Sequence, residues 1–311
     1  MASQNEWLTA LKTYLPWTTS PLVISAPMGG FAWSPLATAV SLAGGLGLIG
    51  SLNDMSSNPA ITSSLTLPLG VGILAFICKI EDVIPLIAEF KSAVVWLFAA
   101  SELALYKDWV DALRRASLET KVWIQVGNVE AALHVASSAY PGALCLQGAD
   151  AGGHGFEKGA GIISLVPEAA DALRNEGLGH IPLLASGGIA DGRGVAAALA
   201  LGAAGVVAIL EAEDGGQLRG PNIWPEAYNG RSMVIQSYED YDNGVSLEEI
   251  QRLHNEAVER EDKGFATGRK GRVAIWAGTG AGIVKEVKGA ADIVEKVRKE
   301  AKEITQGLGK W

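Results

Sequence analysis

Eight short apolar runs recur along the chain, and this repeat constrains the fold more than any other feature of the sequence. Each run is rich in Val, Ile and Leu and is followed by Gly, Pro or Ser and then by a helical pattern. The runs start 22 to 38 residues apart, which is the length of one strand–loop–helix–loop unit. They are Val23–Ala26, Leu46–Gly50, Leu69–Phe76, Ala93–Ala99, Lys121–Val126, Ala143–Gly148, Ile181–Ser186 and Gly205–Ile209.

Nearly continuous apolar strands that alternate with helices are typical of a parallel sheet covered on both faces. Eight such units close a (β/α)8 TIM barrel, whereas fewer would give a doubly wound sheet, which is the alternative fold. We therefore predict an α/β protein with a TIM barrel core over residues 1–210. A lid or side segment over the barrel mouth is predicted for 211–285, and a C-terminal helix that packs back on the barrel for 286–311.

Composition and charge exclude several classes of protein. The net charge is −9 and the chain has no block of basic residues, which argues against nucleic-acid binding. The two cysteines, Cys78 and Cys145, cannot form a disulfide framework and lack the common metal-site spacings, so we expect two small buried residues in a reducing compartment. The sequence leaves the oligomeric state open, with a homodimer as one alternative.

An uncharged stretch over residues 13–53 raises the question of a membrane span. Four prolines and several glycines interrupt it, whereas a spanning helix needs about 20 apolar residues in a row. No basic segment precedes a short apolar core, so the sequence also predicts no secretory signal. We expect a cytoplasmic protein in which this stretch forms a buried strand and a buried helix.

One histidine stands out as a candidate catalytic residue. In TIM barrels the active site lies on the loops that follow the carboxyl ends of the strands. His134 falls within a predicted helix, His180 precedes a strand and His254 lies on a charged outer helix, whereas His154 follows a strand in a glycine-rich loop. Histidine is suited to proton transfer near neutral pH, so we predict a catalytic role for His154. The alternative is a loop histidine that only forms a structural hydrogen bond.

Two glycine-rich turns are candidate ligand sites. Gly187 and Gly188 follow the seventh strand, where barrels often bind a phosphate with backbone N–H groups, although a tight turn would also require glycine. Met28 follows the first strand and could pack on an aromatic ring or simply belong to the core. The GxGxxG pattern at 45–50 does not open a helix, so a dinucleotide-binding fold is not indicated.

Four segments together resemble the nitronate monooxygenase family, formerly called 2-nitropropane dioxygenase. They are Ala26-Pro-Met-Gly-Gly30, the Ala-Gly-Gly-Leu-Gly run at 43–47, Gln147-Gly-x-Asp-Ala-Gly-Gly-His154 and Ser186-Gly-Gly-Ile189. The segments 224–231 and 276–280 resemble the fungal branch of the family.

The resemblance implies an FMN-containing barrel that oxidises alkyl nitronates with O2 to a carbonyl compound and nitrite, without NAD(P)H. It implies that His154 is the catalytic residue. The residues that it assigns to FMN are Met28, Gln125, Gln147, Gly152, Gly187 and Gly188.

The sequence departs from the family pattern in two places. The family's eighth strand ends in a Gly-Thr-Arg-Phe-like run that holds the FMN phosphate, whereas here 205–209 leads into an acidic, glycine-rich stretch. An Asn that is usual in the third strand is Gly72 in this chain. Two alternatives therefore stay open: another barrel flavin oxidoreductase that uses NAD(P)H, and a barrel with a weakened FMN site that no longer catalyses the reaction.

Overall fold

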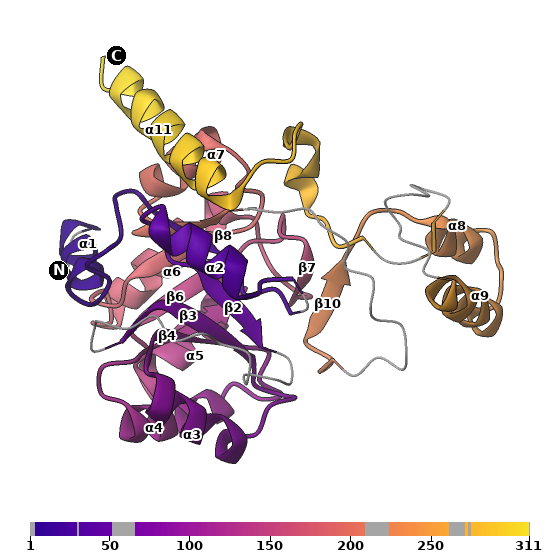
Figure 1. Ribbon diagram of the computed structural model, residues 1–311, viewed down its shortest axis with the longest axis horizontal. Coiled ribbons are helices and arrows are strands. Elements are labelled where there is room, and N and C mark those ends of the chain that lie inside the picture. The colour runs from indigo at the N-terminus through magenta and orange to yellow at the C-terminus, as the bar shows by residue number, and fades with distance from the viewer. Residues whose placement is uncertain are drawn as a thin grey trace.

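The computed structural model describes residues 4–29, 31–51, 66–208, 224–260, 271–272 and 275–310. Eight parallel strands form a nearly closed barrel with helices between them (Figure 1). Neighbouring strands follow the order β1-β9-β8-β6-β5-β4-β3-β2 around the barrel. The strands are β1 (Leu22–Ser25), β2 (Leu48–Ser51), β3 (Leu67–Leu74), β4 (Ser92–Phe98), β5 (Lys121–Val126), β6 (Ala143–Gln147), β8 (Leu183–Ser186) and β9 (Gly205–Ala208).

The two ends of this sheet meet where β1 approaches the start of β2. Leu46 N donates a hydrogen bond to Val23 O at 3.0 Å, and Ser25 N donates to Leu46 O at 3.1 Å. Each of the eight predicted apolar runs overlaps one barrel strand, so the predicted TIM barrel is confirmed. The prediction works because strands covered on both faces must be apolar along their whole length.

Helices connect most of the barrel strands. They are α2 (Ser34–Leu42), α3 (Ile80–Phe90), α4 (Leu105–Ala116), α5 (Val129–Ala139), α6 (Ile162–Asn175) and α7 (Gly192–Ala200). The side chain of Asn128 accepts from Ala131 N, and that of Asp191 accepts from Arg193 N and Gly194 N. Each of these caps satisfies backbone N–H groups that have no partner inside the helix.

Helix α1 (Gln4–Tyr14) covers the end of the barrel at which the strands begin. Trp123 Nε1 donates to the Tyr14 hydroxyl at 3.1 Å, and Trp7 Nε1 donates to the carbonyl of Gly179, shortly before β8. Burial raises the pKa of Tyr14 far above its ordinary value, so the phenol stays protonated. The opposite end, where the strands finish, is therefore the open mouth of the barrel.

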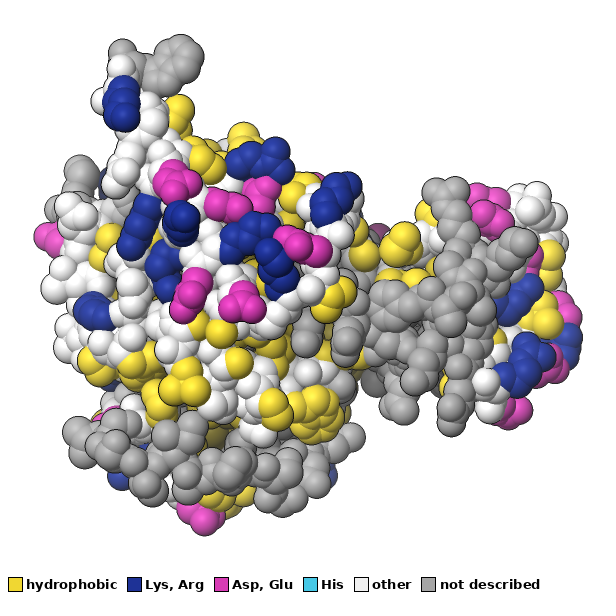
Figure 2. Space-filling model, turned by 45° about the horizontal axis from the view of Figure 1, so that its top comes forward, with side chains coloured by type: hydrophobic (Ala, Val, Ile, Leu, Met, Phe, Trp, Pro, Cys, Tyr) yellow, Lys and Arg dark blue, Asp and Glu magenta, His cyan; other side chains and the backbone are white. Residues whose placement is uncertain are grey.

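Helix α11 (Ala290–Leu308) lies against α2 and α7 on the outside of the barrel (Figure 1). Its Arg298 is 7% exposed and donates hydrogen bonds to the carbonyls of Pro21, Ala43 and Gly44. Acidic and basic side chains mix on the face that carries this helix (Figure 2), in line with the pairs Lys288–Glu286 and Lys299–Glu303.

The region between the barrel and α11 contributes a second, smaller sheet. Strand β10 (Tyr228–Arg231) pairs antiparallel with β7 (Gly153–Phe156) at the mouth of the barrel. Helices α8 (Gln236–Asp242) and α9 (Leu247–Glu259) pack on each other and lie to the side of the barrel (Figure 1). The Ser246 side chain caps α9 by accepting from Glu249 N. A 3-10 helix, η2 (Thr279–Ile283), precedes α11. The boundaries of the three predicted parts, and the predicted cover of the mouth by the middle one, stay predictions.

The cysteine and membrane predictions can be checked on the described residues. Cys145 is buried and Cys78 half-buried, both with free thiols. Among the described helices, none combines the length and the apolar character that crossing a bilayer requires.

Candidate active site at the barrel mouth

His154 lies on strand β7, and not in a loop as the sequence predicted. It stands opposite Gly230 in the antiparallel pair with β10. The loop prediction fails because the four residues Gly-His-Gly-Phe carry no pattern of alternating apolar and polar residues. The strand forms through pairing with residues 72 to 78 positions later in the chain. The pairing holds His154 on regular backbone instead of a free loop.

The imidazole of His154 lies among tryptophan rings. The Trp224 indole stacks on it with ring centroids 3.7 Å apart and planes 6° apart. The Trp276 ring lies 4.7 Å away at an interplanar angle of 49°. The tilted contact lies within the range of about 4.5–7 Å that aromatic pairs favour, and the parallel contact is a face-to-face stack at van der Waals distance.

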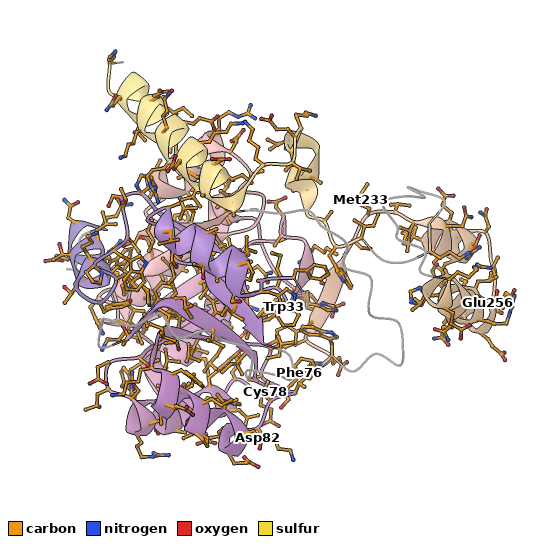
Figure 3. All side chains as sticks on the ribbon, in the orientation of Figure 1. Trp33, Phe76, Cys78, Asp82, Met233 and Glu256 are labelled. Carbon is orange, nitrogen blue, oxygen red and sulfur yellow. The ribbon has the colours of Figure 1, made fainter. Side chains whose placement is uncertain are left out.

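Trp224 in turn packs on aromatic residues of the barrel rim. The ring centroid of Phe76, which follows β3, lies 4.9 Å from that of Trp224, and the ring centroid of Phe98, the last residue of β4, lies 6.2 Å from it. Tyr228 of β10 lies 6.4 Å from the indole. Figure 3 labels Phe76 on the side of the barrel that faces β10. These contacts place His154 beside the carboxyl ends of β3 and β4, which is the active-site end of a TIM barrel.

Gln147, the last residue of β6, links the barrel to the His154 backbone. Its Nε2 donates to the His154 carbonyl at 3.1 Å. Because a carbonyl can only accept a hydrogen bond, this contact fixes the orientation of the Gln147 amide, with Nε2 toward the His154 carbonyl and Oε1 away from it. That oxygen is buried and has no hydrogen-bond partner among the described residues. A buried acceptor without a donor is costly, so Oε1 is a candidate to accept a hydrogen bond from a bound group.

Gln125, near the end of β5, is already partly engaged inside the protein. Its Oε1 accepts from the Trp96 indole N–H at 3.0 Å, and the residue is 8% exposed. Met28, in the turn after β1, is half-buried, and its carbonyl accepts from Phe31 N and Ala32 N.

The glycines after β8 have conformations that other residues rarely adopt. Gly187 has φ +108° and Gly188 has φ +71°. A Cβ added to Gly187 would lie 2.8 Å from Gly148 O, and one added to Gly188 would lie 3.0 Å from Asp150 Cβ. The turn after β8 therefore packs directly on the loop between β6 and β7.

The same loop also contacts the segment before η2. A Cβ on Gly152 would lie 2.5 Å from Gly278 N, so Gly152 is glycine because the two backbones touch there. Thr279 N donates to Asp150 O, and its hydroxyl donates to Asp150 Oδ1 at 2.8 Å. The structure thus brings the loops of Gly152 and Gly188 together and joins Gln147 to His154. The assignment of these residues to FMN stays a prediction.

The other histidines differ from His154 in their surroundings. His134 and His180 are exposed, as expected for a helix surface and for the end of the barrel opposite the mouth. His254 is on α9 as predicted, but its side chain is buried and its Nδ1 lies 3.0 Å from Arg272 O. Within the described residues, no group of three or more His, Cys, Asp or Glu side chains could hold a metal ion.

Sequence reasoning did not single out Trp224 and Trp276 as residues of the site. Both lie in segments that resemble the fungal branch of the family, which was the available signal. Their place around His154 depends on pairing between distant parts of the chain, which local patterns do not encode. Arg219, which the sequence offers as a source of positive charge near the mouth, and the acidic stretch after β9 lie outside the described residues.

Comparison with known proteins agrees with this architecture. A family model described as nitronate monooxygenase matches residues 87–209. The match ends where the sequence departs from the family pattern. The chain is 39% identical to nitronate monooxygenase npaC of Metarhizium robertsii, over 97% of this chain and 96% of that protein. It is 33% identical to a nitronate monooxygenase of Neurospora crassa, over 95% and 93% of the two chains.

The alignment with the Metarhizium protein spans 350 positions, whereas this chain has 311 residues. At least 39 positions of that alignment therefore have no counterpart here. A shorter match covers 59% of this chain and 50% of a Mycobacterium tuberculosis protein, at 32% identity. That protein is named (3aS,4S,5R,7aS)-5-hydroxy-7a-methyl-1-oxo-octahydro-1H-indene-4-carboxyl-CoA dehydrogenase.

Solved structures share the fold. FabK from Thermotoga maritima superposes with a TM-score of 0.68 at 25% identity, covering 96% of this chain and 98% of that one. A nitroalkane oxidase from Streptomyces ansochromogenes superposes with a TM-score of 0.64 at 21% identity, covering 95% and 99%.

Proposed function

Because the chain belongs to the nitronate monooxygenase family, we propose that it is an FMN-dependent enzyme that oxidises alkyl nitronates with O2. In the balanced reaction, two nitronate anions and one O2 give two carbonyl compounds and two nitrite ions. The observation that carries the proposal is the position of His154, held beside the carboxyl ends of the strands within a chain that is related to nitronate monooxygenases over nearly its whole length.

The residues at the mouth suit a flavin. The buried Gln147 Oε1 is an acceptor that a flavin N–H could satisfy. Backbone N–H groups of Gly187 and Gly188, after β8, would face the phosphate, as in other TIM barrels. Met28 and Gln125 would lie toward the ring, and Gly152 would keep the adjoining loop in place. A bound flavin would supply the redox chemistry, as an electron acceptor for the carbanion-like carbon of the nitronate and a donor to O2.

His154 would act on the substrate in two ways, which depend on whether the substrate is the neutral nitroalkane or the nitronate. With a neutral nitroalkane the imidazole would take the proton from the carbon next to the nitro group. With a nitronate, which has already lost that proton, it would orient the anion. The protein as a whole carries a charge of −9, so an anionic substrate needs local positive charge near the mouth. Arg231 of β10, which is half-buried and donates to Phe156 O, and the exposed Lys158 are described residues that could supply it.

A second candidate is a barrel flavin oxidoreductase that uses NAD(P)H. The partial similarity to the indene-4-carboxyl-CoA dehydrogenase of Mycobacterium tuberculosis favours it, although over only 59% of the chain. Release of nitrite from a nitronate without NAD(P)H separates the two activities. The third alternative, a barrel that no longer binds flavin, predicts a colourless protein that takes up no added FMN.

Absorbance and turnover together test the proposal. We expect the purified protein, with or without added FMN, to show the flavin spectrum and to release nitrite as it consumes O2.

Exchange of His154→Ala should lower turnover of a neutral nitroalkane by about 100-fold or more, which is the usual contribution of a general base, and leave the flavin content unchanged. His134→Ala, on the exposed face of α5, is the matched control. Retention of full activity by H154A would exclude His154 as the catalytic residue.

A further inference from the structure

The region after the barrel strands supplies both indoles that flank the His154 imidazole. Trp224 covers one face of the ring in parallel at 3.7 Å, and Trp276 lies at 4.7 Å and 49°. The imidazole therefore lies in a slot, defined here as the space bounded by Trp224, Trp276 and the backbone of Gly230.

The Trp224 wall of the slot is supported by the barrel itself. Phe76 and Phe98, from the ends of β3 and β4, and Tyr228 of β10 contact the indole. Phe98 and Tyr228 also meet each other edge to face at 5.3 Å. Three rings, one from β4, one from β10 and one from the segment after β3, thus determine where the Trp224 indole can lie.

The Trp276 wall is held by backbone pairing. Met233 N donates to Ile275 O at 2.9 Å, and Ser232 forms an antiparallel bridge with Trp276, so this short segment continues the sheet beyond β10. A Cβ added to Gly230 would lie 2.6 Å from the Trp276 ring and 3.3 Å from His154 Nε2. Position 230 therefore needs a residue without a side chain for both rings to take these places.

We propose that Trp224 and Trp276 are positioning residues that hold the His154 imidazole in its working orientation. The inference rests on the proposed function, because it takes His154 as the residue that acts on the nitroalkane. A histidine side chain otherwise has several rotamers, and the backbone of β7 alone does not select one of them. The two indoles select it, Trp224 by stacking in parallel on the ring and Trp276 by contacting it at a tilt.

Reaction of the histidines with diethyl pyrocarbonate, followed by peptide mapping, tests the orientation without relying on activity. In the wild-type protein we expect the exposed His134 and His180 to react fastest, the buried His254 slowest, and His154 clearly more slowly than His134. In Trp224→Leu and Trp276→Leu the reaction of His154 should accelerate several-fold. The slow reaction of His254 must persist, because it shows that the variants are folded. An unchanged rate at His154 in both variants overturns the proposal.

Turnover with two forms of one substrate gives the second readout. For the neutral nitroalkane, whose proton must be taken in a defined direction, kcat should fall by about tenfold or more in Trp224→Leu, since small misplacements of a reacting group cost this much. Turnover of the pre-ionised nitronate should fall much less, and KM for both forms should change little. Trp224→Phe, which retains a ring that can stack, should restore most of the kcat. Equal losses for both substrate forms, or a Phe variant as impaired as the Leu variant, overturn the proposal.

These outcomes separate the inference from the proposed function. If H154A keeps its activity, the catalytic assignment fails, whatever the tryptophan variants do. If H154A is inactive while the Leu variants leave both the modification rate and kcat unchanged, the proposed function stands and the positioning role is wrong.

Discussion

The ring of Pro27 occupies the place that a side chain at position 72 would take. A Cβ built on Gly72 would lie 2.2 Å from Pro27 Cβ and 2.6 Å from Pro27 Cγ. Gly72 belongs to β3 and Pro27 to the turn after β1, so the contact joins two barrel units that are separated by β2. The family resemblance implies Asn at position 72, and the structure gives a physical reason for glycine in this chain.

Exchange of Gly72→Asn should therefore destabilise the protein. The new side chain overlaps Pro27, and overpacking of a dense interior costs about 1–3 kcal/mol. Urea unfolding measures the loss. Gly282→Asn is the matched control, because a Cβ there meets nothing within 4 Å, and its unfolding free energy should stay close to that of the wild type. A Gly72→Asn protein as stable as the wild type would mean that Pro27 is not held in this place.

Most of the barrel could be predicted from the sequence because its signals are local. A parallel strand buried on both faces has to be apolar throughout, as in Val94, Val95 and Leu97 of β4, which are fully buried. Helix starts depend on one side chain and a backbone N–H two or three residues later, as at Asn128. Each of these features is visible within a short window of sequence.

The surroundings of His154 could not be predicted in the same way. Strand β7 has only four residues, two of them glycine, and it is a strand because Tyr228–Arg231 pairs with it. The stacking partner Trp224 is 70 residues from His154 in the sequence. The orphan oxygen of Gln147 follows from a hydrogen bond to a backbone carbonyl, which no residue pattern reveals. Glycine-rich motifs marked the loops correctly but did not show that they pack on one another.

The glycine turn after β8 allows a test that separates backbone strain from ligand binding. Gly188→Ala should lower the unfolding free energy by about 1–2 kcal/mol, because φ +71° is unfavourable for a residue with a Cβ. It should also weaken FMN binding, since the Cβ presses on Asp150 and shifts the turn. Fluorescence titration with FMN measures the affinity, and urea unfolding measures the stability.

Gly177→Ala is the control for the strain alone. Its φ of +75° is similar, but a Cβ there meets nothing within 4 Å, and the residue follows α6, away from the mouth. This variant should lose a similar free energy of unfolding and keep the FMN affinity of the wild type. Equal FMN affinities in the two variants would show that the Gly188 turn does not contact the cofactor.

Arg298 should be the most important single side chain for attaching α11. Its guanidinium bonds to three backbone carbonyls, of Pro21, Ala43 and Gly44, in a nearly buried place. Exchange to Met keeps the volume but leaves the carbonyls without donors, which should cost about 2–4 kcal/mol. Arg298→Lys should recover only part of this, because an ammonium group lacks the planar fork that reaches all three. Arg252→Met is the control, because it removes only exposed ion pairs to Glu249 and Glu256 and should lower the unfolding free energy by less than about 1 kcal/mol. If urea unfolding shows a comparable loss for Arg298→Met and Arg252→Met, Arg298 does not attach α11.

Asp191 at the start of α7 predicts a pH-dependent contribution to stability. Its burial alone would raise the pKa of the carboxyl, but hydrogen bonds from the Arg193 side chain and from the amides of Gly194 and Arg193 outweigh this and lower it. A carboxyl whose pKa is lower in the folded state stabilises the protein above its unfolded pKa, about 3.9, and loses this contribution as the pH falls through the folded value. Asp191→Ala should therefore lower the unfolding free energy by about 1 kcal/mol at pH 7, the usual contribution of an N-cap, and by less as the pH falls below about 3.9.

Asp191→Asn keeps a good cap without the charge, so its stability at pH 7 should stay within a few tenths of a kcal/mol of that of the wild-type protein. The measurement is the difference in unfolding free energy between each variant and the wild type at several pH values. If the Ala difference does not shrink toward low pH, the charge of Asp191 makes no contribution to the cap.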